Sequence, residues 1–413
     1  MQFVTFIANN LRWLLGGFLL TFCSAFGQTF FIALSAGDIR AEYGLSHGEF
    51  GNLYMLATLG SALTLPWIGK IVDRYSAAQV TLMIVPLLAL ACVGMALSAS
   101  IITLVVVIYM LRLFGQGLMT QNALTATGRW FAANRGRAVS LVTLGYNASE
   151  ALLPFVFVAL FAWFGWRSGW LIAASALLII ALPVIYAFLR EERQPNSVEV
   201  HETRLAVREW TRALVLRDPI FWILLTGTLA PPFIGTTIFF HQVYLVEIRG
   251  WALETFALSF SLMAAMTICF ALISGALIDR FSAVRLLPTF LIPLAFSCLV
   301  LSVFDEIWSA FAFMALMGVS YGFSSTLFGA LWPEVYGTRH LGSIRAVVVA
   351  IMVFATAAGP GITGTLIDIG IDYPTQIGVM GFYCICVCVV MTFASRQLRL
   401  RLESQLANNA ATE

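Results

Sequence analysis

The sequence predicts an all-α membrane protein whose twelve transmembrane helices form two pseudo-symmetric bundles of six. Of its 413 residues, 60% are hydrophobic and only 11% are charged, and the mean hydropathy is +0.90. Soluble domains carry about a quarter charged residues, so this composition is typical of a chain that lies in a lipid bilayer. The tract Gly-x-x-x-Asp-Arg at 69–74 returns at 275–280, half the chain later. Repeated halves in helical membrane proteins are typical of transporters.

Six apolar segments in the first half are each long enough to cross about 30 Å of hydrocarbon, which takes roughly 20 helical residues. Short polar tracts separate these segments and set their ends. The predicted spans are 12–36, 47–68, 79–98, 101–127, 138–163 and 168–189. With the residues before them they form a first bundle, 1–189.

The second half repeats this pattern after 190–218, a polar segment crowded with arginine and glutamate that we interpret as a cytoplasmic linker. The predicted spans are 219–246, 254–275, 286–303, 308–331, 344–367 and 375–394. They form a second bundle, 219–395. The residues that follow, 396–413, contain three arginines near their start and are expected to be a cytoplasmic tail.

Orientation follows from the arginine and lysine residues, which accumulate on the cytoplasmic side of membrane proteins. With both termini in the cytoplasm, nineteen of these residues lie inside, three lie outside (Arg40, Arg167 and Arg249), and Arg112 falls within a span. This distribution rejects the inverted topology and explains the net charge of +2 without a nucleic-acid partner. We expect a multi-pass protein of the cell membrane, of the bacterial inner-membrane type, that works as a monomer.

The sequence predicts no cofactor and no metal site. All seven cysteines lie in apolar spans, where cysteine behaves as a small hydrophobe, and alternate residues such as those of Cys384-x-Cys-x-Cys do not share a helix face. The phosphate-binding tract Gly-x-x-x-x-Gly-Lys-[Ser/Thr] does not occur, which argues against an ATP-driven pump. The spans contain no His-Glu metal cluster or nucleophile–base set, so we do not expect an enzyme.

Three motifs resemble those of the major facilitator superfamily, and the resemblance covers essentially the whole chain. The Gly-x-x-x-Asp-Arg tract follows spans 2 and 8, and Arg112-Leu-Phe-Gly-Gln-Gly117 in span 4 is similar to the superfamily's Arg-x-x-x-Gln-Gly tract. The loop Trp130-Phe-Ala-Ala-Asn-Arg-Gly-Arg-Ala138 resembles that of monocarboxylate transporters and oxalate/formate-type antiporters. The resemblance implies secondary transport by alternating access.

The chain departs from this branch in its charges. Monocarboxylate transporters that it resembles carry a lysine in span 1 and an acid–arginine pair in span 8, whereas neither span contains an internal charge here. The carboxylate-binding residues of the branch therefore do not carry over. The arginines of the nitrate/nitrite branch, the Gly-Pro tract of drug/proton antiporters in span 5 and the sugar-porter signature are absent as well.

The repeated loop places an acid and an arginine at the end of a span twice. Asp73 and Asp279 can accept hydrogen bonds from the start of a neighbouring helix, and such a contact can form in one transport state and break in the other. We therefore expect a gating role for Asp73, Arg74, Asp279 and Arg280. The alternative is that Arg74 and Arg280 only enforce topology.

Two charges lie deep within spans, where an ionisable residue costs several kcal/mol and is by default functional or paired. At 1.5 Å per residue, Arg112 lies roughly 16 Å into span 4 and Glu150 roughly 18 Å into span 5 from the opposite face. Both fall near the midplane, where transporters bind substrate. We expect a buried pair or a shared polar cavity, with Glu150 as the proton-coupling residue. The alternative is a permanent ion pair that only fixes the packing.

The other candidate residues are polar groups of the spans. Around Arg112 we expect the substrate to contact Gln28, Tyr54, Tyr146, Asn147 and Tyr321. His241 follows Pro231-Pro232, which should break or kink span 7. Because His241 lies late in that span, we expect it to belong to a gate on the outer side.

These observations predict a carrier of a small organic anion, monocarboxylate-like, because Arg112 is the one fixed cation within the spans and binds a carboxylate with two hydrogen bonds. Transport would be coupled to protons, as symport or antiport, or would occur by exchange. An exporter of hydrophobic or drug-like compounds is the alternative within this class. A membrane sensor without transport, signalling through the linker or the tail, is the alternative from another class.

Overall fold

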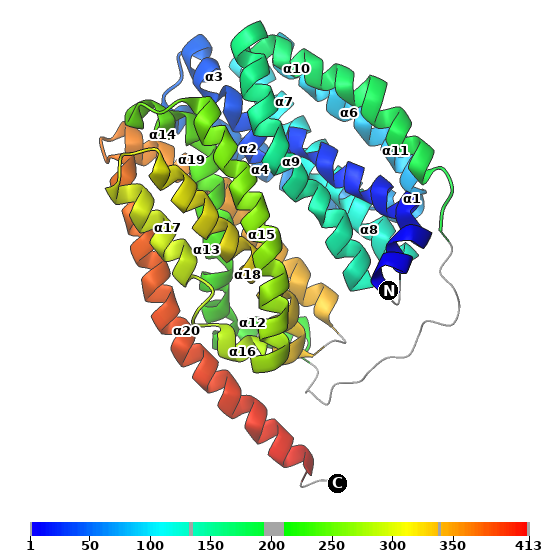
Figure 1. Cartoon of the computed structure of the whole chain (residues 1–413), viewed down its shortest axis with the longest axis vertical. Coiled ribbons are helices and arrows are strands. Elements are labelled where there is room, and N and C mark those ends of the chain that lie inside the picture. The colour runs from blue at the N-terminus through cyan, green and yellow to red at the C-terminus, as the bar shows by residue number, and fades with distance from the viewer. Residues whose placement is uncertain (1, 132–134, 194–209, 338–339, 411–413) are drawn as a thin grey trace.

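The computed structural model describes residues 2–131, 135–193, 210–337 and 340–410, and these ranges are helical without any strand. Ten helices in these ranges are long and apolar enough to cross a membrane, and Ile292–Val303 is a shorter apolar helix. The helices run roughly side by side in two groups (Figure 1). The predicted all-α membrane fold is therefore confirmed.

The helices of the first half follow the predicted spans closely. Span 1 consists of α1, η1 and α2, span 4 of α7, η3 and α8, and span 6 of α10, η4 and α11. The bounds are α1 (Gln2–Cys23), η1 (Ser24–Gly27), α2 (Thr29–Ile32), η2 (Ala33–Ser35), α3 (Ala36–Tyr43), α4 (His47–Ile68), α5 (Ile71–Arg74), α6 (Ala77–Leu97), α7 (Ile101–Leu111), η3 (Arg112–Met119), α8 (Thr120–Trp130), α9 (Arg135–Phe164), α10 (Trp166–Ser175), η4 (Ala176–Ala181) and α11 (Leu182–Leu189).

The second half begins with a short helix after the linker and then has six spans. Its bounds are α12 (Arg212–Arg217), α13 (Pro219–Phe240), α14 (Gln242–Arg249), α15 (Leu253–Phe281), α16 (Ala283–Leu286), α17 (Ile292–Val303), α18 (Trp308–Tyr336), α19 (Leu341–Asp368) and α20 (Tyr373–Ala410). The last helix, α20, continues to Ala410, well beyond residue 394, where span 12 was predicted to end.

Local sequence signals start several of these helices. The side chains of Ser46, Ser76 and Ser100 each accept a hydrogen bond from the backbone N–H of the residue three positions later. The side chain of that later residue accepts a hydrogen bond from the backbone N–H of the serine. These capping boxes satisfy N–H groups that a helix start leaves without partners. Asp218 caps α13 in a similar way, by accepting from the Ile220 N–H at 3.2 Å.

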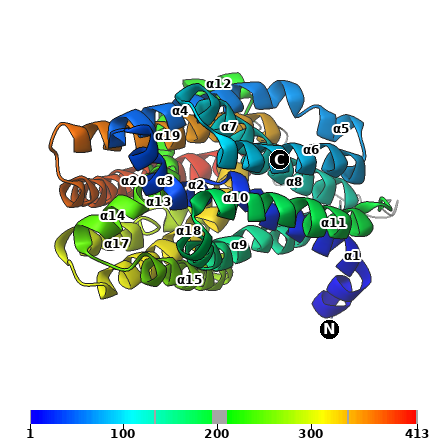
Figure 2. The ribbon, with the colours of Figure 1, turned by 90° about the horizontal axis from the view of Figure 1, so that it is seen from above.

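The two halves meet along two pairs of long helices. α4 packs against α19 on one side, and α9 packs against α15 on the other. Figure 2 shows these pairs on opposite sides of the molecule, with α13 and α2 between them. In Figure 1 the two groups of helices converge at the end that carries α3 and α14 and diverge toward the end that carries α12 and α16. We call the converging end, opposite α12 and α16, the outer face.

Two helix interruptions fall at positions that the sequence did not predict. Span 1 is interrupted, because Gln28 has an extended backbone (φ −85°, ψ 153°) between η1 and α2. Span 7 is not broken at Pro231-Pro232, since α13 continues through both prolines, and the interruption falls at His241. Transmembrane helices tolerate proline where neighbouring helices pack closely against them, and Tyr321 of α18 donates a hydrogen bond to the Pro231 carbonyl oxygen at 3.3 Å.

Candidate functional site

The interruption of span 1 brings its backbone into contact with span 4. A side chain at Gly27 would lie 2.1 Å from the Leu111 carbonyl oxygen and 2.7 Å from the Cα of Gly115. The two glycines therefore allow the backbones to approach as no larger residues could. On the span 4 side, Arg112 begins η3, which has the wider π-helical turn. Such turns inside α-helices are frequent at functional sites.

Arg112 is the buried charge of this region, with 3% of its surface exposed. Its Nη1 donates to the Gly27 carbonyl oxygen and to the Thr29 Oγ1, both at 3.2 Å. The Thr29 hydroxyl is in turn 2.7 Å from the Tyr54 hydroxyl, and the guanidinium carbon lies 5.4 Å from the centre of the Tyr54 ring. Arg112 Nε is buried and has no hydrogen-bond partner among the described residues.

The negative end of the interrupted helix compensates part of the Arg112 charge. Gly27 ends η1, and carbonyl groups at the end of a helix carry partial negative charge. A guanidinium has five N–H donors, and the two contacts with Gly27 and Thr29 both use Nη1. The arrangement therefore retains donors for an anion.

Glu150, the second charge within the spans, does not form an ion pair with Arg112. It is 2% exposed and accepts a hydrogen bond from the Tyr146 hydroxyl at 3.2 Å. The ion pairs among described residues do not include Arg112 or Glu150. The expectation of a direct pair is thus not met, and the two charges instead share a polar region in which Tyr146 interacts electrostatically with both.

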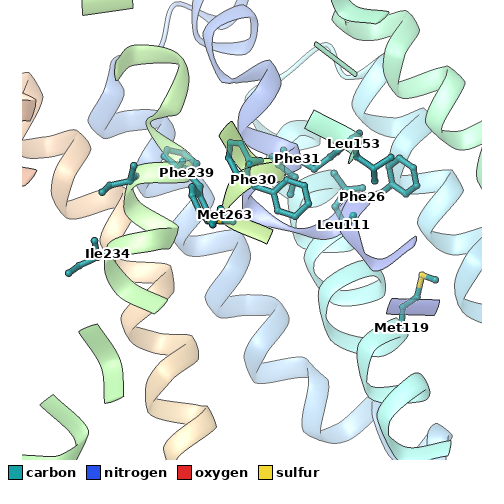
Figure 3. Packing of buried hydrophobic residues seen from close by; sticks show 14 of the residues in the cluster. Phe26, Phe30, Phe31, Leu111, Met119, Leu153, Ile234, Phe239 and Met263 are labelled. Atoms are coloured by element: carbon teal, nitrogen blue, oxygen red, sulfur yellow. The ribbon is translucent and has the colours of Figure 1, made fainter. Parts of the chain in front are cut away.

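The remaining predicted substrate contacts fall into two groups. Gln28 and Tyr54 are buried beside Arg112 in the first half, at 7% and 0% exposure. Tyr146, Asn147 and Tyr321 are half-buried, and Tyr321 lies within electrostatic range of Glu150 and Tyr146. Aromatic side chains enclose this region, and Figure 3 shows Phe26, Phe30 and Phe31 of span 1 near Leu111 and Leu153, with Phe239 and Met263 of the second half nearby. Among described residues no cluster of His, Cys, Asp or Glu could hold a metal ion.

His241 lies at the outer face, where the halves touch. Its Nε2 is 3.1 Å from the Pro360 carbonyl oxygen, and its ring centre is 6.1 Å from that of His47 in the first half. The next residue, Gln242, donates from Nε2 to the Phe30 carbonyl oxygen at 2.9 Å. This bond joins the second half directly to the interrupted span 1.

A carboxylate of the second half also caps a helix of the first half at this face. Asp368 Oδ2 accepts from the Gly48 N–H at 2.8 Å and from the Ser46 hydroxyl at 2.6 Å. These groups belong to the start of α4, where the helix dipole favours a negative charge. Nearby, Arg40 Nη2 is 3.9 Å from Glu247 Oε2. Asp368, Glu247 and Gln242 thus make polar contacts with the first half at the outer face.

The predicted gating residues of the repeated loop are only partly described. The side chains of Asp73 and Asp279 lie outside the described residues. Arg74 and Arg280 are exposed at the face that carries the linker, and the Arg280 guanidinium carbon lies 5.2 Å from the centre of the Phe281 ring.

Sequence reasoning missed Gly27, Gln242 and Asp368. The interruption at Gln28 lies inside an apolar run with no proline, so hydropathy predicts an unbroken span there. Gln242 and Asp368 sit at the ends of predicted spans, where polar residues are ordinary. The sequence feature that could have indicated the interruption is the pair Gly27-Gln28 within an apolar run, because glycine permits close backbone approach.

Comparisons with known proteins agree with this architecture. The sequence profile of the Major Facilitator Superfamily matches residues 17–360, with a further match over 242–405. No curated protein sequence matches the chain significantly.

Solved structures share the fold at low sequence identity. A bacterial homolog of the human lysosomal transporter Spinster, inward-facing and unoccupied, has a TM-score of 0.70 at 16% identity, covering 96% of this chain and 98% of that chain. Its inward-facing, occupied form gives 0.63 at 15% identity and covers 97% of both chains. A mutant of the nucleoside transporter NupG gives 0.65 at 12% identity, with 94% of this chain and 99% of that chain covered. The chain therefore belongs to the major facilitator superfamily and is a membrane transporter rather than an enzyme.

Proposed function

We propose that this transporter carries a small organic anion, monocarboxylate-like, that binds at Arg112. The observation that carries the proposal is a guanidinium that is buried without a carboxylate partner among the described residues and has an unpartnered Nε. A bound carboxylate would supply the missing counter-charge and accept two parallel N–H bonds. The phenol of Tyr54 and the hydroxyl of Thr29 would orient it.

Glu150 supplies the proton coupling in this proposal. It is buried, touches Tyr146, and lies on α9, which packs against α15 of the other half. A carboxyl group at such a moving interface can exchange its proton as the two bundles, 1–189 and 219–395, rock about the site. The proposed setting is a bacterial inner membrane with both termini in the cytoplasm, where a proton gradient is available.

Export of hydrophobic compounds is the second candidate. The aromatic side chains around span 1 favour it, since the Phe26, Phe31 and Phe157 rings pack at 4.8–5.8 Å between centres. In that case Arg112 would hold the interrupted helix together and would not contact the ligand. Loss of the guanidinium should abolish ligand binding if the substrate is an anion, and should leave ligand binding in place if the substrate is an apolar compound.

The test is ligand binding to purified protein, measured by thermal shift and calorimetry with acetate, lactate, pyruvate and benzoate. We expect at least one carboxylate to bind the wild type, Arg112→Lys to weaken this binding because an ammonium lacks the planar two-point contact, and Arg112→Gln to abolish it. Arg249→Gln, at a largely buried arginine bonded to the Leu301 carbonyl oxygen, is the control. Undiminished carboxylate binding in folded Arg112→Gln, or binding of apolar amphiphiles alone, would contradict the proposal.

A further inference from the structure

Four consecutive residues of span 1 connect the charged site to the contact between the halves. Gly27 and Thr29 hold Arg112 at 3.2 Å, and Phe30 accepts from Gln242 of the second half at 2.9 Å. Between them Gln28 is extended, so the segment is not stiffened by a continuous helix. A displacement of Gly27 and Thr29 therefore also displaces the Phe30 carbonyl group, which accepts the hydrogen bond from Gln242.

Gln242 is an unusual partner for this role because it is incompletely satisfied. Its side chain is fully buried, and its Oε1 has no hydrogen-bond partner among the described residues. A buried amide oxygen without a partner is costly. The bond from Nε2 to the Phe30 carbonyl oxygen is thus the sole side-chain hydrogen bond of Gln242 among the described residues. If the interface between the halves rearranges, Oε1 can gain a partner as well.

We propose that the segment 27–30 couples occupation of Arg112 to separation of the halves at the outer face, with Gln242 as the positioning residue that transmits the change. The inference rests on the proposed function in that an anion is what occupies Arg112. A carboxylate that accepts from the unpartnered Nε draws the guanidinium away from Gly27 and Thr29. Their release lets the segment shift, and the Phe30–Gln242 bond no longer fixes the second half to it.

Surrounding contacts place this bond within the closed outer face. Phe240, which precedes the His241 interruption, packs against Tyr54 and Phe50 of the first half with ring centres 4.7 and 5.2 Å apart. A cavity of about 10 Å³, lined by Ala36, His47, Phe240 and His241, lies beside it, which is enough for about one water molecule. Ala36 is buried there at 5% exposure, so it reports on opening.

The experiment is a double-mutant cycle measured without ligand in purified, full-length protein. A cysteine is introduced by Ala36→Cys, and its reaction rate with a water-soluble maleimide reports exposure of the outer face. The same protein without Ala36→Cys gives the background from native cysteines. Melting temperatures establish that each variant is folded.

We expect Gln242→Leu to raise the labelling rate about fivefold, the factor by which one neutral hydrogen bond shifts an equilibrium. Arg112→Gln should raise it as well, and the double variant should not exceed the larger single effect because the two contacts act in series on one segment. Thr29→Val, which removes one Arg112 contact, gives a second route to the same cycle if Arg112→Gln does not fold.

Gln376→Leu is the matched control. Gln376 is also buried, donates from Nε2 to the Ile371 carbonyl at 2.9 Å, and has an unpartnered Oε1, but both of these residues belong to the second half. Its labelling rate should equal that of the parent. The inference would be overturned if the labelling rate of the variant carrying both Gln242→Leu and Arg112→Gln rose by the product of the two single effects. It would also be overturned if Gln376→Leu raised the labelling rate as much as Gln242→Leu. Since no ligand is added, this result is independent of whether the substrate is an anion.

Discussion

At the scale of single residues, the separation of Arg112 from Glu150 changes what a substitution of the acid should do. In a buried ion pair, removing one partner strands the other charge and costs about 3–5 kcal/mol. Here Arg112 is held by Gly27 and Thr29, and Glu150 by Tyr146. The acid can therefore be neutralised without stranding the guanidinium.

Glu150→Gln is accordingly expected to fold normally and to lose coupling selectively. The amide oxygen can still accept from Tyr146, but the side chain cannot carry a proton. In proteoliposomes, a pH gradient should no longer drive accumulation of the carboxylate that binds Arg112, which for one coupled proton reaches about tenfold per pH unit. Exchange between the two sides should persist. Gradient-driven accumulation equal to that of the wild type would remove Glu150 from the coupling mechanism.

A second residue-scale prediction concerns Asp218, at the start of α13 outside the membrane. Burial pushes the pKa of Asp218 upward, but the hydrogen bonds and charge of Arg401, with smaller contributions from Ile220 and Tyr336, outweigh it and bring the pKa below its ordinary 3.8. A depressed folded-state pKa stabilises the protein above the unfolded pKa, and this contribution is lost as pH falls through the folded value. The pair should therefore stabilise fully at neutral pH and weaken only below about pH 4.

Arg401→Met tests this interpretation by leaving the Asp218 carboxylate buried without its cation. We expect a loss of about 3 kcal/mol in stability at pH 7, seen as a lower melting temperature, and a smaller loss as the pH approaches 4. Arg399→Met, at an exposed arginine two residues earlier, should have little effect. A pH-independent loss would show that packing of the Arg401 side chain matters and its charge does not.

At the scale of elements, the sequence predicted the spans well and their internal breaks poorly. Hydropathy and length locate a span because a helix must satisfy its own backbone in lipid. The break at Gln28 depends on contact with span 4, through Gly27 and Gly115, and no pattern within span 1 encodes that contact. Arg112 and Glu150 were recognised because charges in spans are rare, whereas their lack of pairing depends on three-dimensional placement.

Gly27→Ala should disrupt this element because the new methyl group would lie 2.1 Å from the backbone oxygen of Leu111, which has no rotamer to change. We expect a loss of several kcal/mol in stability, as for overpacking of a well-packed interior, together with weaker carboxylate binding at Arg112. Gly329→Ala on α18 is the control, because no atom lies within 4 Å of its added methyl group. Similar melting temperatures for the two variants would contradict the proposed close packing of spans 1 and 4.

At the scale of the whole molecule, the two halves are in contact at the outer face and diverge toward the end that carries α12 and α16. The hydrogen bonds that Asp368 and Gln242 make with the first half lie at this outer face. Such an arrangement is held by interactions that the opposite arrangement lacks. Asp368 at the start of α4 is one of them, since it bridges the halves with charge-assisted hydrogen bonds.

Asp368→Asn should therefore shift the population toward an open outer face. The amide oxygen can still accept a hydrogen bond but loses the charge that the α4 dipole attracts. The difference between a charged and a neutral hydrogen bond is about 1 kcal/mol, so the shift should be about fivefold. Spin labels at Ile102 and Glu254, exposed residues near the outer ends of α7 and α15, would report a longer distance in the substituted protein. Asp372→Asn neutralises a carboxylate that caps Thr375 within the second half alone and should leave the distance distribution unchanged. If Asp368→Asn also leaves it unchanged while the protein stays folded, the outer face is held by the aromatic contacts of Phe50, Tyr54 and Phe240, and the carboxylate only caps α4.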